Sequence, residues 1–205
     1  MSEVLRWQVQ AKDAGSAARV GTLTLGRAEL QTPVFMPVGT QASVKSQTPA
    51  DVLETGSRLI LANTYHLMLR PGAELVQQLG GVQRFMSWPN AILTDSGGYQ
   101  VFSLAELRKL DDDGVVFRSH IDGSQQALSP ERSMEVQRLL GSDIAMVLDE
   151  CPPGNADRAT VQRAVDRTSR WAERCLATPR APGQARFGIV QGGSYLDLRL
   201  AHLSS

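Results

Sequence analysis

The chain has 205 residues, of which 42% are hydrophobic and 20% charged, with a formal net charge of zero at pH 7. This composition is typical of a globular protein with one substantial core, and it argues against a protein that coats nucleic acid by bulk charge or spans a membrane. No secretory signal pattern begins the sequence, and its two cysteines lack redox-pair or zinc-knuckle spacing, so we expect a cytoplasmic protein.

Alternating polar and apolar residues in "LRWQVQAKD" and "ARVGTLTLG" predict an N-terminal antiparallel cap over residues 1–32. From residue 33 onward the pattern changes to apolar runs that end in small, polar or charged residues. Helix-like segments separate most of these runs, and this alternation predicts a parallel α/β sheet. The runs are residues 34–40, 59–64, 91–98, 144–151 and 186–193.

Helix signals lie between the predicted strands. Thr48 before a proline predicts the start of one helix, and Ser129 before a proline starts another that ends at Gly141. A stripe of apolar residues predicts a helix over 157–177. Residues 115–124 have the pattern of an inserted hairpin arm, and the acidic run 111–113 is interpreted as a solvated turn rather than a metal site.

Polar side chains follow the predicted strands where each strand ends. Asn63, Asp95, Asp149 and Gln191 are such residues. In parallel α/β sheets ligands bind at the carboxyl ends of the strands, so we expect these groups to lie near one another.

Asp95 is followed by Ser-Gly-Gly-Tyr, which places bare backbone and an aromatic ring beside a carboxylate. Asp149 and Glu150 end the next strand; because successive residues face opposite sides, only one of them can enter a shared pocket. Two acids close together would raise one pKa, which suits proton transfer. Capping of backbone amides and structural salt bridges are the alternative roles for these acids.

Gln191 adds an amide and precedes Gly192 and Gly193. An amide suits the acceptor edge of guanine, a carboxylate suits its N1 and exocyclic amine donors, and Tyr99 could stack on the ring. A tight strand exit is the structural alternative for this segment.

Together these strings resemble the tRNA-guanine transglycosylases, the queuine tRNA-ribosyltransferases of bacterial type. The matching stretches run in order from about residue 30 to 199: "TPVFMPVGTQASVKSQTP", "LILANTYHLMLRPG", "AILTDSGGYQVFSL", "SHIDGS", "SPERSMEVQRLLGSDIAMVLDECPP" and "FGIVQGG". The resemblance implies a modified (β/α)8 TIM barrel, of which 33–205 would supply about the first five strand-helix units of a single, incomplete catalytic domain.

The resemblance also implies a reaction and its residues. The family replaces guanine at the wobble position of a tRNA anticodon with a 7-deazaguanine such as preQ1, through a covalent bond between ribose and an aspartate. Asp95 matches the proton acceptor, and Ser96, Gly97, Gly98 and Tyr99 match the base-binding loop. Asp149 matches the acid that binds the donor edge, Gln191 the amide that binds the acceptor edge, and Asn63 a polar pocket residue.

Other family features match no residue of this sequence. In the family, later segments carry the nucleophilic aspartate, the structural zinc ligands and much of the basic tRNA-binding surface. We therefore expect this chain to be a fragment or truncated product without exchange activity and without a metal ligand. The resemblance implies a homodimer only for the full-length protein. Two alternatives stay open. One is a non-catalytic homologue that binds a base or a partner, and the other is a retaining glycosidase that uses Asp95 and Asp149.

Overall fold

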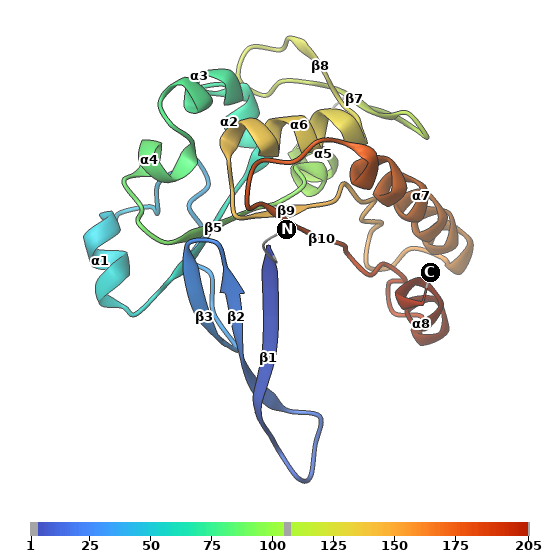
Figure 1. Cartoon of the computed structure of the whole chain (residues 1–205). Helices are drawn as coiled ribbons and strands as arrows, with labels where there is room; N and C mark the ends of the chain where they lie inside the picture. Colours follow the sequence, from blue (N-terminus) through green and yellow to red (C-terminus); the bar gives the residue numbers. More distant parts are fainter. Residues whose placement is uncertain (1–3, 105–107, 205) are drawn as a thin grey trace.

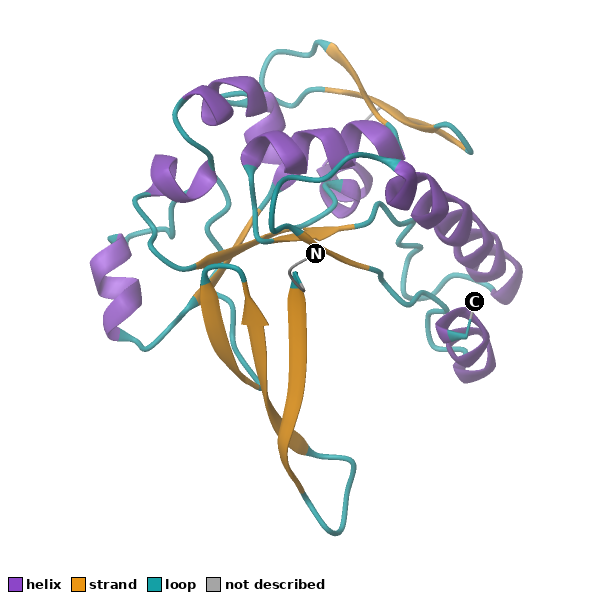
Figure 2. Cartoon of the chain, in the orientation of Figure 1, coloured by secondary structure: helices purple, strands orange, loops and turns teal. Residues whose placement is uncertain are grey.

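The computed structural model describes residues 4–104 and 108–204. Its strands form three sheets, which Figure 2 shows in orange among the helices. The strands are β1 (Leu5–Lys12), β2 (Arg19–Leu25), β3 (Ala28–Thr32), β4 (Leu59–Ala62), β5 (Ala91–Thr94), β6 (Arg108–Asp111), β7 (Gly114–Arg118), β8 (Gln125–Leu128), β9 (Ile144–Met146) and β10 (Ala185–Phe187). The helices are α1 (Pro49–Glu54), α2 (Thr64–Leu69), α3 (Ala73–Gln78), α4 (Val82–Met86), α5 (Gly98–Leu104), α6 (Pro130–Leu140), α7 (Arg158–Ala177) and α8 (Leu196–Leu203).

The N-terminal segment forms the predicted antiparallel cap. Strand β2 pairs with both β1 and β3, and the cap extends away from the rest of the molecule in Figure 1. The alternation of polar and apolar residues therefore predicted both the strands and their antiparallel pairing.

Four of the predicted apolar runs contribute strands to one parallel sheet, in the order β10-β9-β5-β4. Strands that follow one another in this set along the chain are also neighbours in the sheet, so the chain winds in one direction. The prediction of a parallel α/β sheet is confirmed for these strands.

The prediction of a strand over 34–40 is wrong in its extent, because the structure forms no regular strand there. In this run Val38 makes only an isolated parallel bridge with Leu61, and Phe35 is 80% exposed. Pro33 and Pro37 lie at or beside this run, and proline has no N–H to donate to a neighbouring strand. The Pro37 carbonyl accepts a hydrogen bond from the Leu61 N–H, and the Gly39 N–H donates to the Leu61 carbonyl at 2.7 Å. These two bonds flank the bridge of Val38, and no regular strand extends the pairing.

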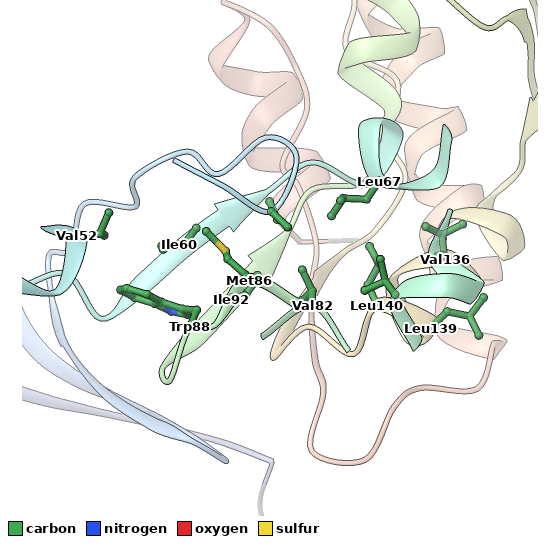
Figure 3. Close-up of a cluster of buried hydrophobic side chains, with 14 residues drawn as sticks. Val52, Ile60, Leu67, Val82, Met86, Trp88, Ile92, Val136, Leu139 and Leu140 are labelled. Carbon is green, nitrogen blue, oxygen red and sulfur yellow. The ribbon is translucent and has the colours of Figure 1, made fainter. Parts of the chain in front are cut away.

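Strands β4, β5 and β9 are largely buried on both faces, as their continuous apolar runs predict, whereas the edge strand β10 is partly buried. One face packs Ile60 and Ile92 against the helices, in the cluster shown in Figure 3. The other face packs against Leu25 and Leu30 of the cap. The second cluster includes the first residue of each parallel strand, and Arg27 of the cap pairs with Asp143 directly before β9, so the cap lies against the beginnings of these strands. Those first residues are Leu59, Ala91, Ile144 and Ala185.

Helix boundaries follow the capping signals in the sequence. The Thr48 side chain accepts a hydrogen bond from the Asp51 N–H, and the Ser129 side chain caps α6 in the same way. Gly141 ends α6 in a left-handed conformation with φ 71°. The predicted apolar stripe of α7 packs inward, with Trp171 fully buried.

The predicted hairpin arm is part of a three-stranded antiparallel sheet, β6-β7-β8. Its far turn is fixed to α2, because the Tyr65 hydroxyl lies 2.8 Å from Nδ1 of His120. The acidic run 111–113 includes a turn, as predicted, but Asp112 pairs with Arg167 and Arg170 of α7. This turn therefore helps to bind the arm to the helix layer.

Within the described ranges, no helix is both long and apolar enough to cross a membrane. The same residues contain no group of three or more histidine, cysteine or acidic side chains that could hold a metal ion.

Candidate functional site

The four polar residues predicted at the strand ends lie beyond the carboxyl ends of the parallel strands. Asn63 and Asp95 directly follow β4 and β5, whereas Asp149 and Gln191 lie in the loops after β9 and β10. Asn63, Asp149 and Gln191 are buried. Buried polar groups need partners, so their contacts define what the site can bind.

Donors from two segments surround the carboxylate of Asp95. Its Oδ1 accepts hydrogen bonds from the backbone N–H of Thr64, at 2.8 Å, and of Gly97, at 3.2 Å. Its Oδ2 accepts from the side-chain amides of Asn63 and, at 2.9 Å, Gln100. The start of α2 and the turn into α5 therefore hold the carboxylate in a fixed orientation.

Burial and hydrogen bonding act on Asp95 in opposite directions. Burial raises the pKa of this carboxyl and is the largest influence on it, whereas the hydrogen bonds from Asn63, Thr64, Gln100 and Gly97 lower it. The net effect is a raised pKa. A carboxyl in this state can accept a proton more readily than one in water, which is the property that a general base needs.

Asp149 joins the other predicted residues. Its Oδ1 accepts a hydrogen bond from the Ser96 hydroxyl at 3.2 Å, and its Oδ2 accepts from the side-chain amide of Gln191 at 2.7 Å. Since Ser96 follows Asp95 in the chain, these contacts connect all three strand ends. The structure thus brings Asp95, Asp149 and Gln191 together, as the sequence pattern predicted.

The pKa of Asp149 is raised mainly by burial. Hydrogen bonds from Gln191 and Ser96 lower it, and the negative charge of Asp95 adds only a small increase. The sequence predicted proximity of the two acids as the cause of a raised pKa. The structure shows that removal from water is the larger cause.

Glu150 turns away from Asp149, so only one of the two acids enters the site, as predicted. Both acids lie in the loop after β9, which ends at Met146, so the alternation of side chains along a strand is not the cause. Its carboxylate pairs with Arg167 at 2.5 Å, and its backbone N–H donates to the Thr168 hydroxyl at 3.1 Å. Both partners belong to α7, so Glu150 anchors the loop after β9 to the helix layer.

The glycines beside Asp95 allow close packing of the protein itself. A Cβ on Gly98 would lie 3.0 Å from the Asp149 carbonyl oxygen, and one on Gly97 would lie 3.3 Å from the Tyr65 nitrogen. Gly97 also has φ +81°, a conformation that other residues rarely adopt. The sequence suggested that these glycines leave space for a ligand, but the space they free is occupied by neighbouring backbone.

Tyr99 makes none of the contacts that link the other site residues. Its side chain, on the first turn of α5, is 65% exposed. It lines an open hollow of about 480 Å³ together with Phe102, Glu150, Cys151 and Pro152, among others. The ring of Tyr99 is therefore accessible from this hollow.

Sequence reasoning missed three residues that support the site. Gln100 donates to Asp95 and lies in the quoted "SGGYQ" string, but its contact depends on the turn of α5. Thr64 donates from its backbone, which no side-chain pattern reveals. Nothing in the sequence indicated His202, which accepts a hydrogen bond from the backbone of Gln191.

Comparison with known proteins places this arrangement in context. The sequence model of the family described as "Queuine tRNA-ribosyltransferase" matches residues 13–205. The chain is 62% identical over 185 residues to the queuine tRNA-ribosyltransferase of Sorangium cellulosum, covering 90% of this chain and 47% of that protein. It is 56% identical over 196 residues to that of Symbiobacterium thermophilum, covering 95% and 49%, and 53% identical over 192 residues to that of Desulforamulus reducens, covering 94% and 52%. The chain spans about half the length of the curated relatives it matches.

Proposed function

The chain belongs to the queuine tRNA-ribosyltransferase family, and from that membership we propose that it carries the base-recognition half of a tRNA-guanine transglycosylase. Such an enzyme exchanges guanine at the anticodon wobble position of tRNA for a 7-deazaguanine, preQ1 or queuine. The observation that supports this proposal most strongly is the hydrogen-bonded pair of Asp149 and Gln191.

This pair is complementary to one edge of guanine. On that edge an acceptor, O6, lies beside two donors, N1–H and the exocyclic amine. The Gln191 amide has two N–H groups, of which one donates to Asp149 and the other is available for O6. Each oxygen of a carboxylate can accept more than one hydrogen bond, so Asp149 can still accept from both base donors.

Asp95 supplies the proton chemistry in this proposal. In base exchange the glycosidic bond to guanine breaks while ribose bonds to an aspartate, which by family resemblance lies outside this sequence. The incoming base then attacks that ribose carbon, displaces the aspartate and loses a proton from its nitrogen. The raised pKa of Asp95 suits it to accept that proton.

We extend the proposal to the architecture. The parallel sheet winds in one direction, Val38 bridges to β4, and the cap covers the beginnings of the strands. These features support a modified (β/α)8 barrel whose first part, in one catalytic domain, is this chain. The family resemblance alone carries the expectation of a structural zinc, whose ligands match no residue of this sequence; of the two cysteines here, Cys151 is exposed and Cys175 packs in the core. Binding of the tRNA anticodon loop, homodimer formation and a cytoplasmic location remain predictions.

Calorimetric titration of the 205-residue chain with guanine, preQ1 and methyl riboside tests base recognition. We expect the two bases to bind and the riboside not to bind. Binding of the riboside without either base would instead support a glycosidase.

Exchange is tested separately with labelled guanine and tRNA. We expect no incorporation by this chain alone, because the resemblance assigns the nucleophile elsewhere. Measurable incorporation would contradict that assignment, while base binding without exchange is also what a non-catalytic homologue would show.

A further inference from the structure

The loop that carries Gln191 is supported from behind by α8. The backbone N–H of Gln191 donates a hydrogen bond to Nδ1 of His202, at 2.8 Å. A backbone N–H can only donate, so Nδ1 of His202 is the acceptor. His202 lies in the last turn of α8, and this turn therefore contacts the loop directly.

A second contact brings the same loop against α8. Gly192 has φ +129°, and a Cβ at this position would lie 2.6 Å from the backbone nitrogen of Arg199. The Gly192 carbonyl also accepts a hydrogen bond from the Tyr195 N–H at 3.0 Å. Two consecutive loop residues thus rest on the helix, and only glycine permits so close an approach at position 192.

The helix is itself attached to α7 at its first turn. Arg158 of α7 forms a salt bridge with Asp197, and its guanidinium lies 5.4 Å from the centre of the Tyr195 ring. Leu198 is buried beneath the helix. With its first turn anchored in this way, α8 can hold His202 in a defined place at its other end.

Gln191 is therefore held at two points, by His202 through its backbone and by Asp149 through its side chain. We propose that His202 is a positioning residue that fixes the side-chain amide of Gln191 for recognition of the base. This inference rests on the proposed function of the Asp149–Gln191 pair. His202 contacts the backbone of Gln191 rather than the side-chain amide that the proposal assigns to the base, so its effect is exerted through Gln191.

The test compares His202→Leu with His202→Asn in the full 205-residue chain. Leucine removes the acceptor, whereas asparagine can place a carbonyl oxygen near the position of Nδ1. We expect His202→Leu to weaken guanine binding and to speed hydrogen exchange of the Gln191 backbone N–H. Each change should be about fivefold to tenfold, which corresponds to the loss of one neutral hydrogen bond. His202→Asn should restore both, while the Ile92 amide, which donates to Asp143, exchanges as before.

A measurement on the unsubstituted chain keeps the test decisive if His202→Leu fails to fold. Uniform ¹⁵N labelling should reveal scalar coupling across the hydrogen bond between the Gln191 nitrogen and Nδ1 of His202. Absence of this coupling, or loss of guanine binding in both variants alike, would overturn the positioning role. Coupling without any guanine binding would refute the proposed function while leaving the contact intact.

Discussion

At the scale of single residues, burial and hydrogen-bond donors have opposite effects on the pKa values of two acids in the site. Asp95 and Asp149 both have pKa values raised by burial, and both accept hydrogen bonds that oppose this effect. Removing a donor should therefore raise the pKa further, because the ionised form loses a partner.

The Asn63→Ala variant tests this balance at Asp95. The Asn63 amide donates to the carboxylate, and its loss should shift the titration of Asp95 to higher pH in a ¹³C NMR titration. Asn155→Ala changes an exposed asparagine and serves as the matched control. An unchanged titration in Asn63→Ala would show that this hydrogen bond does not stabilise the ionised carboxylate.

The raised pKa values also predict how stability depends on pH. The folded chain keeps protons on these acids at pH values where the unfolded chain, with an ordinary aspartate pKa of 3.8, has lost them. The free energy of unfolding should therefore fall as pH rises from that value through the raised pKa values. Asp149→Asn should weaken this dependence in denaturant unfolding measured at several pH values; a steeper fall in the variant would contradict the predicted direction.

At the scale of elements, a buried carboxylate connects the cap to the parallel sheet. Asp143 accepts hydrogen bonds from the Arg27 side chain at 2.7 Å, from the Gln83 amide at 2.9 Å and from the Ile92 N–H at 2.8 Å. Arg27 lies between β2 and β3, whereas the other partners belong to α4 and β5. This single side chain thus fixes the cap where the parallel strands begin.

Asp143→Ala should lower the free energy of unfolding by about 3 kcal/mol, because buried donors on Gln83 and Ile92 lose their acceptor. Arg27→Ala should cost only about 1 kcal/mol, since its side chain is 52% exposed and water screens the pair. Arg19→Ala alters an exposed arginine of the cap and is the control. Equal losses in Asp143→Ala and Arg27→Ala would show that the ion pair, rather than the buried donors, dominates.

Elements with a strong local pattern could be predicted from the sequence, and those set by tertiary contacts could not. Capping residues and apolar stripes indicated α1, α6 and α7, because their causes lie within a few residues. The prediction of a strand over 34–40 failed because Pro37 within the run, and Pro33 before it, have no N–H for regular strand pairing. The contact of Arg27 with Asp143 joins residues 116 positions apart, and no local pattern encodes it.

The same division holds within the site. The proximity of Asp95, Asp149 and Gln191 could be predicted because the carboxyl ends of parallel strands meet at the same edge of a sheet. The role of His202 depends on the path of α8 after the strand, and the packing role of Gly98 depends on the loop after β9. Both became visible only from the folded chain.

At the scale of the whole molecule, the two ends of the parallel strands have separate tasks. The cap and Asp143 stabilise the beginnings of the strands, and the polar residues at the other end form the site. Substitutions at Asp143 should therefore lower stability, whereas Asp149→Asn should alter base binding and leave the fold intact. In the proposed function, Asp149 and Gln191 act together as a receptor for the guanine edge.

Calorimetry with guanine and hypoxanthine, which lacks the exocyclic amine, tests this claim most directly. The unsubstituted chain should bind guanine at least about tenfold more tightly, because hypoxanthine leaves one acceptor of Asp149 unpaired. Asp149→Asn should lose this preference while unfolding at a similar denaturant concentration. Equal affinity for the two bases in the unsubstituted chain, or an undiminished preference in Asp149→Asn, would show that Asp149 does not bind the exocyclic amine of guanine.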